Sequence, residues 1–546
     1  MMSQRTFIIS TTLFIALVES ALALQGFCMA DEGWSLTGYQ QIFGGEPESV
    51  RYIFLFYNAL CVGGLWEQLF GSWGIYGFRL LGVLFICASW LVVYSTLRTY
   101  FNRWALFVGI LLVISCHDYG VMVFDHSSIT VFLSLLSAMF VVRAIEQDRM
   151  LFACLAGIVI GVNIFSRIPN VSQAGLLLIF CIPFNRTGTF GNRMVRMLSG
   201  FIIGLFIGIL TVVLLMMALG HADIFISNLE AGFSAASSAD SSHNIGTLIS
   251  VYVSQYIQVA KNMIRVLLPP LLLFSFDNLM FLYAFSTLML LSPFFLGRLS
   301  RYRLPALISL VMLYTLPLGS DFGINNMGEN AVWLAAPAAV GIGAELSSRC
   351  SGLLRLYIRL SATAFCAIFM VMNGIHIAHN AYFDPGSRTV KTHRISHPLA
   401  TTYTTAAYAS STDSILSALQ RYVDHGDYLL CFQSRPMLHY LTRTRPYMYN
   451  PWPWSYDSDM MAGSLHMAER RTAMRHEPWP VIVREKTQII DFTQPDPDWD
   501  STHAADNFAH KNAKVQLIHH FIARHKYHIV WENSQYQILL SADNQH

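Results

Sequence analysis

Charged residues are scarce in this 546-residue chain. Only 12% of the residues are charged and 54% are hydrophobic, whereas soluble proteins carry about 25% charged residues. This shortage argues against an ordinary soluble protein and indicates a membrane protein. The 35 Lys and Arg residues nearly balance the 33 Asp and Glu residues, so we expect no nucleic-acid partner.

Several sequence signatures are also missing. The nine cysteines are scattered and form neither a disulfide framework nor a zinc-ligand spacing. None of the Gly-rich phosphate fingerprints occurs, and no internal repeat is visible. The distribution of apolar runs is therefore the main source of information.

Apolar runs dominate the chain up to residue 377. A helix that crosses the hydrocarbon core needs about 20 apolar residues, with about 17 as a lower limit. Eleven runs are candidates: 7–28, 74–96, 104–118, 122–142, 151–167, 170–184, 197–219, 278–297, 303–319, 330–346 and 355–377. We therefore predict an α-helical polytopic membrane domain at 1–377 and a soluble domain at 378–546.

Loop charge predicts the orientation, because cytoplasmic loops are rich in Lys and Arg. With the N-terminus inside, the inner loops hold Arg5, Arg98, Arg103, Arg143, Arg149, Arg186, Arg193, Arg196, Arg298, Arg301, Arg303, Arg349, Arg355 and Arg359. The outer loops hold only Arg51, Arg79, Arg167, Lys261 and Arg265. An odd number of spans then places the C-terminal domain outside the cytoplasm.

Three segments leave alternatives open. Residues 51–70 contain Asn58, Glu67 and Gln68 among apolar residues, which is typical of an amphipathic helix lying at the membrane interface. Residues 246–276 are either interfacial or re-entrant. The first span could also be a signal peptide, because "ALA" at 21–23 resembles a cleavage site.

The stretch "DEGWSLTGYQQIF" (31–43) follows the first span directly. It places Asp31 and Glu32 at the outer end of a membrane helix, where ionised groups are costly unless they face water or a partner. They are either solvated loop charges or functional groups. Other outer segments favour the functional interpretation, because polar residues gather on the same side of the membrane. These segments are "SCHDYGVMVFDHSSIT" (115–130), "LGSDFGINNMGEN" (318–330), "FSRIPN" (165–170) and "YGFRL" (76–80).

An acidic pair in the first outer loop, an interfacial helix and "YGFRL" opening the second span occur here in this order. In these features residues 1–377 resemble the membrane glycosyltransferases with the GT-C fold. That superfamily includes the protein O-mannosyltransferases and the aminoarabinose transferases that modify lipid A. The resemblance implies a GT-C-type domain that moves a sugar from a polyprenyl phosphate donor to a glycan, lipid or protein acceptor outside the cytoplasm.

The resemblance also implies residue roles. Asp31 would be the general base that deprotonates the acceptor in an inverting transfer, and Glu32 would orient the acceptor or the base. Arginine suits the phosphate of the leaving lipid. Candidates for contacts to the donor phosphate or sugar are Arg79, Arg167, Arg51, Asp321, Asn325, Asn326 and Glu329, with Lys261 and Arg265 as further cations. Each outer arginine could instead reach toward lipid headgroups.

A second polar group contains His117, Asp118, Asp125 and His126. We expect these side chains to contact the acceptor or the sugar. His and Asp also ligate divalent metals, but the spacing matches no metal signature, so we expect no metal and no other cofactor and keep a divalent metal as an alternative. Residues 318–330 could bind phosphate or sugar through backbone N–H groups, or they could form a plain turn.

Two other functions remain open: a transporter or flippase of lipid-linked sugars, and a related polysaccharide polymerase or ligase. A transporter more often places polar groups near the middle of the membrane. We expect a bacterial inner membrane, with the endoplasmic reticulum as the alternative, and a periplasmic C-terminal domain.

The pattern of the C-terminal domain predicts helices at 412–423, 435–441 and 513–525 and strands at 427–432, 479–486, 527–533 and 536–541, which indicates an α/β domain. The aromatic stretch 449–459 packs this domain or binds sugar.

Overall fold

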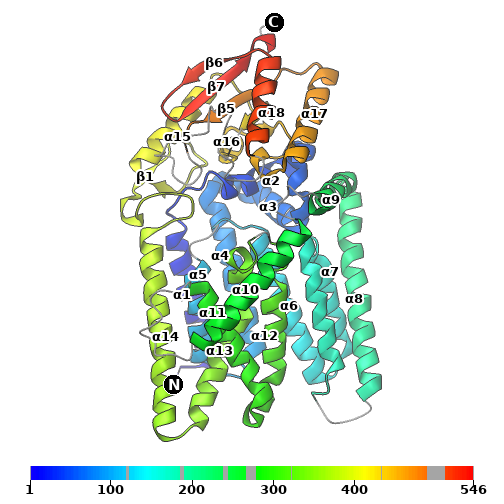
Figure 1. The fold of residues 1–546 in the computed structure, drawn as a ribbon, viewed down its shortest axis with the longest axis vertical. Helices are drawn as coiled ribbons and strands as arrows, with labels where there is room; N and C mark the ends of the chain where they lie inside the picture. Colours follow the sequence, from blue (N-terminus) through cyan, green and yellow to red (C-terminus); the bar gives the residue numbers. More distant parts are fainter. Residues whose placement is uncertain are drawn as a thin grey trace.

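The apolar runs form helices that lie side by side in a long bundle, and a small α/β domain sits on one end of it (Figure 1). The computed structural model describes residues 2–117, 122–184, 190–237, 244–265, 278–320, 322–431, 433, 435–487 and 511–544. We call the end of the bundle that carries the α/β domain its outer end. The chain starts near the opposite end (Figure 1).

Each of the eleven predicted spans corresponds to a helix of the bundle. These helices are α1 (Gln4–Leu22), α4 (Gly74–Leu97), α5 (Arg103–His117), α6 (His126–Gln147), α7 (Met150–Asn163), η3 (Ile168–Cys181), α8 (Phe190–Ala218), α11 (Asn278–Phe295), α12 (Arg303–Thr315), α13 (Ile324–Arg349) and α14 (Gly352–His379). By length and composition, 7 helical stretches of the described residues could cross a membrane, and α5, α7 and η3 are shorter apolar helices. The number of eleven crossings therefore stays a prediction.

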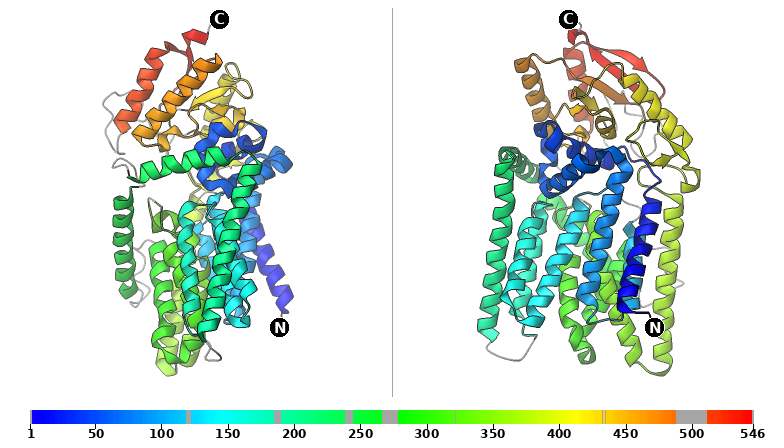
Figure 2. Two further views of the ribbon diagram at one scale, coloured as in Figure 1. Left: turned by 90° about the vertical axis from the view of Figure 1, so that its right-hand side faces the viewer. Right: turned by 180° about the vertical axis from the view of Figure 1, so that it is seen from behind.

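Four helices lie across the outer end instead of running along the bundle (Figures 1 and 2). They are α2 (Asp31–Gly44), η1 (Pro47–Phe56), α3 (Tyr57–Phe70) and α9 (Ala222–Ser237). Helix α3 exposes Leu65 and Leu69 and buries Asn58, and the chain turns after η2 (Gly71–Trp73) at Gly74, whose φ is +59°. Residues 51–70 thus lie in η1 and α3 across the outer end, and their position at the membrane interface stays a prediction.

Helix α10 (Ile245–Arg265) covers the described part of 246–276. It runs obliquely down the side of the bundle and packs against α11 (Figure 1). It therefore does not lie flat across the outer end as α3 does.

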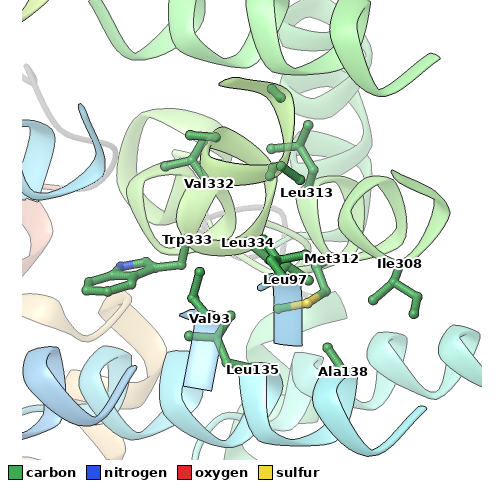
Figure 3. Packing of buried hydrophobic residues seen from close by; sticks show 14 of the residues in the cluster. Val93, Leu97, Leu135, Ala138, Ile308, Met312, Leu313, Val332, Trp333 and Leu334 are labelled. Atoms are coloured by element: carbon green, nitrogen blue, oxygen red, sulfur yellow. The ribbon is translucent and has the colours of Figure 1, made fainter. Parts of the chain in front are cut away.

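Apolar side chains from α4, α6, α12 and α13 form the centre of the bundle (Figure 3). Trp333 and Leu334 of α13 face Val93 and Leu135 of the neighbouring helices in this cluster. All four side chains are buried. This packing holds the four helices in fixed relative positions.

Helices α7 and α8 approach each other through glycines. A Cβ atom built on Gly157 would lie 2.0 Å from the carbonyl oxygen of Phe201, and one built on Gly204 would lie 2.0 Å from that of Cys154. Small residues four apart allow this close backbone contact in membrane helices.

The C-terminal domain contains one five-stranded sheet in the order β4-β3-β5-β7-β6. Strand β3 is parallel to β4 and β5, whereas β7 is antiparallel to β5 and β6. The elements are β1 (His393–Arg394), β2 (Tyr403–Thr404), α15 (Ala406–Leu419), β3 (Tyr428–Cys431), α16 (Met437–Thr442), β4 (Arg445–Pro446), α17 (Ser458–Arg475), β5 (Val481–Glu485), α18 (Lys511–Arg524), β6 (Tyr527–Glu532) and β7 (Tyr536–Ser541), with short helices η6 (Arg388–Val390), η7 (Pro453–Ser455) and η8 (Ala542–Asn544). A further short helix, η5 (Gly297–Tyr302), lies in the bundle between α11 and α12. The predicted class of an α-helical membrane protein with an α/β domain is confirmed. Tyr449 and Tyr456 of the aromatic stretch are buried in the domain.

The C-terminal domain shares a hydrophobic core with the outer end of the bundle. One cluster contains Leu36 of α2, Phe78 of α4, and Leu438 and Ile538 of the C-terminal domain. The amide of Met437 also donates a hydrogen bond to the carbonyl oxygen of Met29 at 3.0 Å. The C-terminal domain is therefore packed onto the region that contains the acidic pair.

Candidate active site

The acidic pair opens α2, directly after the turn that leads out of α1. Asp31 and Glu32 occupy the first turn of α2, where carboxylates interact favourably with the positive end of the helix dipole. Their environments differ, because Glu32 is 1% exposed and Asp31 is half-buried.

Glu32 forms a bidentate ion pair with Arg79 of α4. The Oε1 atom of Glu32 lies 3.0 Å from Nε of Arg79, and Oε2 lies 2.8 Å from Nη2. The same guanidinium donates to the carbonyl oxygens of Ala23, Gln25 and Gly26 at 2.8–3.0 Å. The five N–H groups of arginine thus bind the turn between α1 and α2 together with the start of α2.

This pairing changes the roles considered for the two residues. Arg79 has no N–H group left for a donor phosphate in this structure, although the sequence suggested that contact. Both oxygens of Glu32 accept hydrogen bonds from Arg79, so the ion pair holds this carboxylate in place. Glu32 and Arg79 thereby join the start of α2 to α4 and to the turn before it.

Asp31 accepts a hydrogen bond from the hydroxyl of Tyr382, with an O–O distance of 2.7 Å. Burial raises the pKa of Asp31 from its ordinary value of 3.8 to about 6. The Tyr382 hydrogen bond lowers this pKa, whereas the charges of Asp125 and Glu32 raise it further. A carboxylate with a pKa near 6 is mostly ionised at neutral pH and can accept a proton.

The start of α6 brings Asp125 and His126 to the same region. Asp125 caps α6 by accepting a hydrogen bond from the Ser128 amide at 2.9 Å, which fixes its carboxylate. The His126 ring packs on Phe56, with ring centroids 4.2 Å apart. Asp125 and Arg167 both interact electrostatically with the His126 ring. Arg167 therefore lies close to this group, and its predicted contact to a donor phosphate stays a prediction.

Arg167 directly precedes η3 and is 5% exposed. Its Nη1 atom donates to the carbonyl oxygen of Leu316 at 2.9 Å. This bond fixes a cation next to the start of α6, within electrostatic reach of His126.

Helix α13 contributes Glu329, whose charge raises the pKa of the Tyr382 phenol. The prediction of a loop at 318–330 was wrong in its length, because α13 already begins at Ile324. The side chain of Gln255 binds the Ile324 amide at 2.7 Å and the Phe322 carbonyl at 2.8 Å, which supports this earlier start.

The first turn of α13 exposes Asn325 and Asn326. Their amide side chains are therefore accessible at the outer end of α13. Glu329 lies one turn further along the same helix and is half-buried.

Several predicted residues lie elsewhere or outside the described residues. Arg51 contacts Glu48, Ser227 and the ring of Tyr449, so it joins η1 to α9 and the C-terminal domain. Lys261 is exposed on α10. The residues Asp118 and Asp321 and the side chains of His117 and Arg265 lie outside the described part. No group of three or more His, Cys, Asp or Glu side chains suited to a metal ion is found among the described residues.

Tyr382 was not predicted from the sequence. It follows α14 and is separated from Asp31 by 351 positions. No local pattern marks this tyrosine. The only signal in the sequence was the change in composition near residue 378, which places the segment at the outer end of the last span.

No protein-family model matches the sequence, and no curated protein is significantly similar to it. The structure does resemble solved structures. The crystal structure of ArnT from Cupriavidus metallidurans bound to undecaprenyl phosphate aligns with a TM-score of 0.50 and 13% identity over 97% of both chains. The apo state of ArnT aligns with a TM-score of 0.39 and 11% identity over 98% of both chains. The Archaeoglobus fulgidus oligosaccharyltransferase aligns with a TM-score of 0.42 and 11% identity over 88% of this chain and 70% of that chain.

The similarity to ArnT extends over nearly the whole chain. It shows that the protein has the GT-C type of fold, which confirms the fold expected from the sequence. The chain is therefore an integral membrane protein with a GT-C-type fold.

Proposed function

We propose that the protein is an integral membrane glycosyltransferase that moves a sugar from a polyprenyl phosphate donor to an acceptor at the outer end of the bundle. The observation that carries this proposal is the position of Asp31. Its carboxylate starts α2 at the outer end and has a pKa of about 6. The GT-C fold and the lipid phosphate bound by ArnT support a lipid-linked donor.

In the proposed reaction Asp31 accepts the proton of an acceptor hydroxyl. The acceptor oxygen then attacks the anomeric carbon of the sugar while the bond between that carbon and the phosphate oxygen breaks. Attack from the side opposite the phosphate inverts the anomeric configuration. The products are the glycosylated acceptor, polyprenyl phosphate and protonated Asp31, so atoms and charge balance.

The leaving phosphate develops negative charge and needs a cation near the outer end. Arg167 is the best candidate among the predicted arginines, because it is buried beside the start of α6. The exposed amides of Asn325 and Asn326 are candidates for contacts to the sugar. The acceptor face is the periplasmic side of a bacterial inner membrane in this proposal, which also places the C-terminal domain in the periplasm.

The proposal is tested in cells that carry the wild-type protein, no protein, or Asp31→Asn. Mass spectrometry of polyprenyl-linked sugars and of envelope glycans is the measurement. We expect Asp31→Asn to reproduce the null strain: a donor lipid accumulates and one sugar modification is lost. Exposed Asp424→Asn in the C-terminal domain is the matched control and should behave as wild type. Normal glycans in Asp31→Asn cells at wild-type protein levels would overturn the proposal.

A further inference from the structure

The segment that leads from α14 into the C-terminal domain lies on the turn between α1 and α2. We call residues 380–404 the strap. Its residue Tyr403 accepts a hydrogen bond from the Gly26 amide at 2.8 Å and donates one to the Leu24 carbonyl at 2.8 Å. The guanidinium of Arg388 donates to the Leu22 carbonyl at 3.0 Å. The strap is thus bound to the backbone immediately before the acidic pair.

A buried ion pair fixes the strap internally. Asp384 is 2% exposed, and its carboxylate accepts hydrogen bonds from the Phe27 amide at 2.9 Å and the Thr404 hydroxyl at 2.8 and 2.9 Å. Its Oδ1 atom also lies 3.0 Å from the ammonium nitrogen of Lys391. The carbonyl oxygens of Asp384 and Pro385 accept two further bonds from Lys391, at 2.7 and 2.9 Å. A strap with these contacts has one well-defined position.

Tyr382 lies two residues before this anchor. Its ring stacks on Phe383 with centroids 4.3 Å apart, and Phe383 has a φ of +47°. An aromatic residue rarely adopts this left-handed conformation, and such strain persists only where the surroundings hold it. Burial and the Asp31 charge raise the pKa of the Tyr382 phenol. Tyr382 therefore remains a hydrogen-bond donor at neutral pH.

We propose that Tyr382 is a positioning residue: its hydroxyl holds the Asp31 carboxylate in place, and the strap thereby completes the active site. This inference rests on the proposed function of Asp31 as the base. It gives the C-terminal domain a defined task, because the strap that supplies Tyr382 also joins that domain to the membrane bundle.

The charges around Asp31 make this donor important. Glu32 on α2, the thiol of Cys28 in the preceding turn and Asp125 on α6 face Asp31. The charge of Glu329 on α13 acts on Tyr382. None of these groups stabilises a negative charge on Asp31 by its own charge, whereas the Tyr382 hydroxyl does so by hydrogen bonding. Without the hydroxyl, the pKa of Asp31 should rise.

The first experiment measures Asp31 without any sugar donor. Dicyclohexylcarbodiimide modifies protonated carboxyl groups, and mass spectrometry of the peptide that contains Asp31 gives the extent of modification against pH. For the purified full-length protein we expect the modification of Asp31 to reach its midpoint near pH 6, and for Tyr382→Phe we expect this midpoint at a higher pH. Tyr403→Phe removes a hydroxyl from the same strap and should leave the midpoint unchanged. An unchanged or lower midpoint in Tyr382→Phe would overturn the inference.

The second experiment measures transfer. A hydrogen bond to a charged group has an effect on the order of 10-fold or more, so we expect Tyr382→Phe to lower transfer by about 10-fold at pH 6 and by less at pH 8. Equal losses at both pH values would indicate a merely structural role and contradict the inference. If Asp31→Asn transferred sugar at the wild-type rate, the proposed function would fail, while the carbodiimide midpoint would still decide whether Tyr382 controls Asp31.

A milder change tests the strap itself. Thr404→Val removes the hydroxyl that binds Asp384 and keeps a similar side-chain shape. We expect a smaller rise of the Asp31 midpoint than in Tyr382→Phe. We expect no additional rise when both changes are combined, because both act through the same hydrogen bond. Additive shifts would show that the strap does not act through Tyr382.

Discussion

The two sides of the first turn of α2 differ, although they present the same chemical group. On the bundle side, Glu32 is 1% exposed and both its oxygens bind Arg79. On the outer side, half-buried Asp31 has one hydroxyl donor and other carboxylates nearby. The first arrangement stabilises a charge and the second leaves the carboxylate able to take a proton. Adjacent acids in a sequence can therefore serve structure and chemistry separately.

The largest expected effect on stability comes from breaking the ion pair between Glu32 and Arg79. Glu32→Gln leaves Arg79 buried without its counter-charge, and removing one partner of a buried ion pair costs about 3–5 kcal/mol. We expect a strong loss of thermal stability in detergent, measured by intrinsic fluorescence. If Glu32→Gln unfolded at the wild-type temperature, the claim that the Glu32–Arg79 pair stabilises the protein would be wrong.

Asp31→Asn is the matched change on the outer side, and its effect on stability should have the opposite sign. The pKa of Asp31 is about 6 in the folded protein against an ordinary value of 3.8. The ionised form is therefore less favourable in the folded state above pH 6. Removing the charge should raise the unfolding temperature at pH 7 slightly and should not raise it at pH 3.5. A clear destabilisation at pH 7 would show that Asp31, like Glu32, is a structural residue.

The next effect concerns the contact between α2 and the C-terminal domain. A Cβ atom on Gly33 would lie 2.1 Å from the amide nitrogen of Met437, so Gly33→Ala must push α16 away. Overpacking of this kind costs about 1–3 kcal/mol, and we expect lower stability together with lower transfer. Gly463→Ala in α17 is the control, because its Cβ atom would meet nothing within 4 Å and alanine favours a helix. Equal stability of both variants would contradict the close contact.

The smallest expected effect concerns Asp125, whose charge influences the pKa of Asp31. The charge of Asp125 raises the pKa of Asp31, so Asp125→Asn should lower that pKa. The acid limb, meaning the rise of the transfer rate with pH as Asp31 loses its proton, should then shift to lower pH. Asparagine also caps helices well, so α6 should keep its start. The pH dependence of transfer by purified protein is the measurement. A shift of the acid limb toward higher pH would be inconsistent with this arrangement.

The sequence predicted the fold and singled out Asp31 and Glu32 as candidates, because both rest on strong local patterns. Apolar length marked eleven helices of the bundle but not α10, and the acidic pair directly followed the first span. The partners of these acids could not be predicted, because they come from distant segments. Arg79 makes five hydrogen bonds, and Tyr382 binds Asp31 although 351 positions separate them. These contacts form only because α4 and the strap pack against the same turn.

The boundary of α13 could not be predicted for a related reason. Glycines and asparagines at 323–330 are typical of a loop, but tertiary contacts decide the outcome. Gln255 of α10 binds the backbone at Phe322 and Ile324, and Gly328 leaves room for Tyr283. A helix therefore begins where local preferences favour a turn.

The most direct test of Asp31 as the base is the rate of sugar transfer against pH, measured with purified protein in lipid nanodiscs. We expect the wild-type rate to rise with pH and to reach half its maximum near pH 6, where Asp31 loses its proton. Asp31→Asn should be slower by a factor of about 10² to 10⁴ and should lack this limb. A variant that keeps both the rate and the limb would contradict the account.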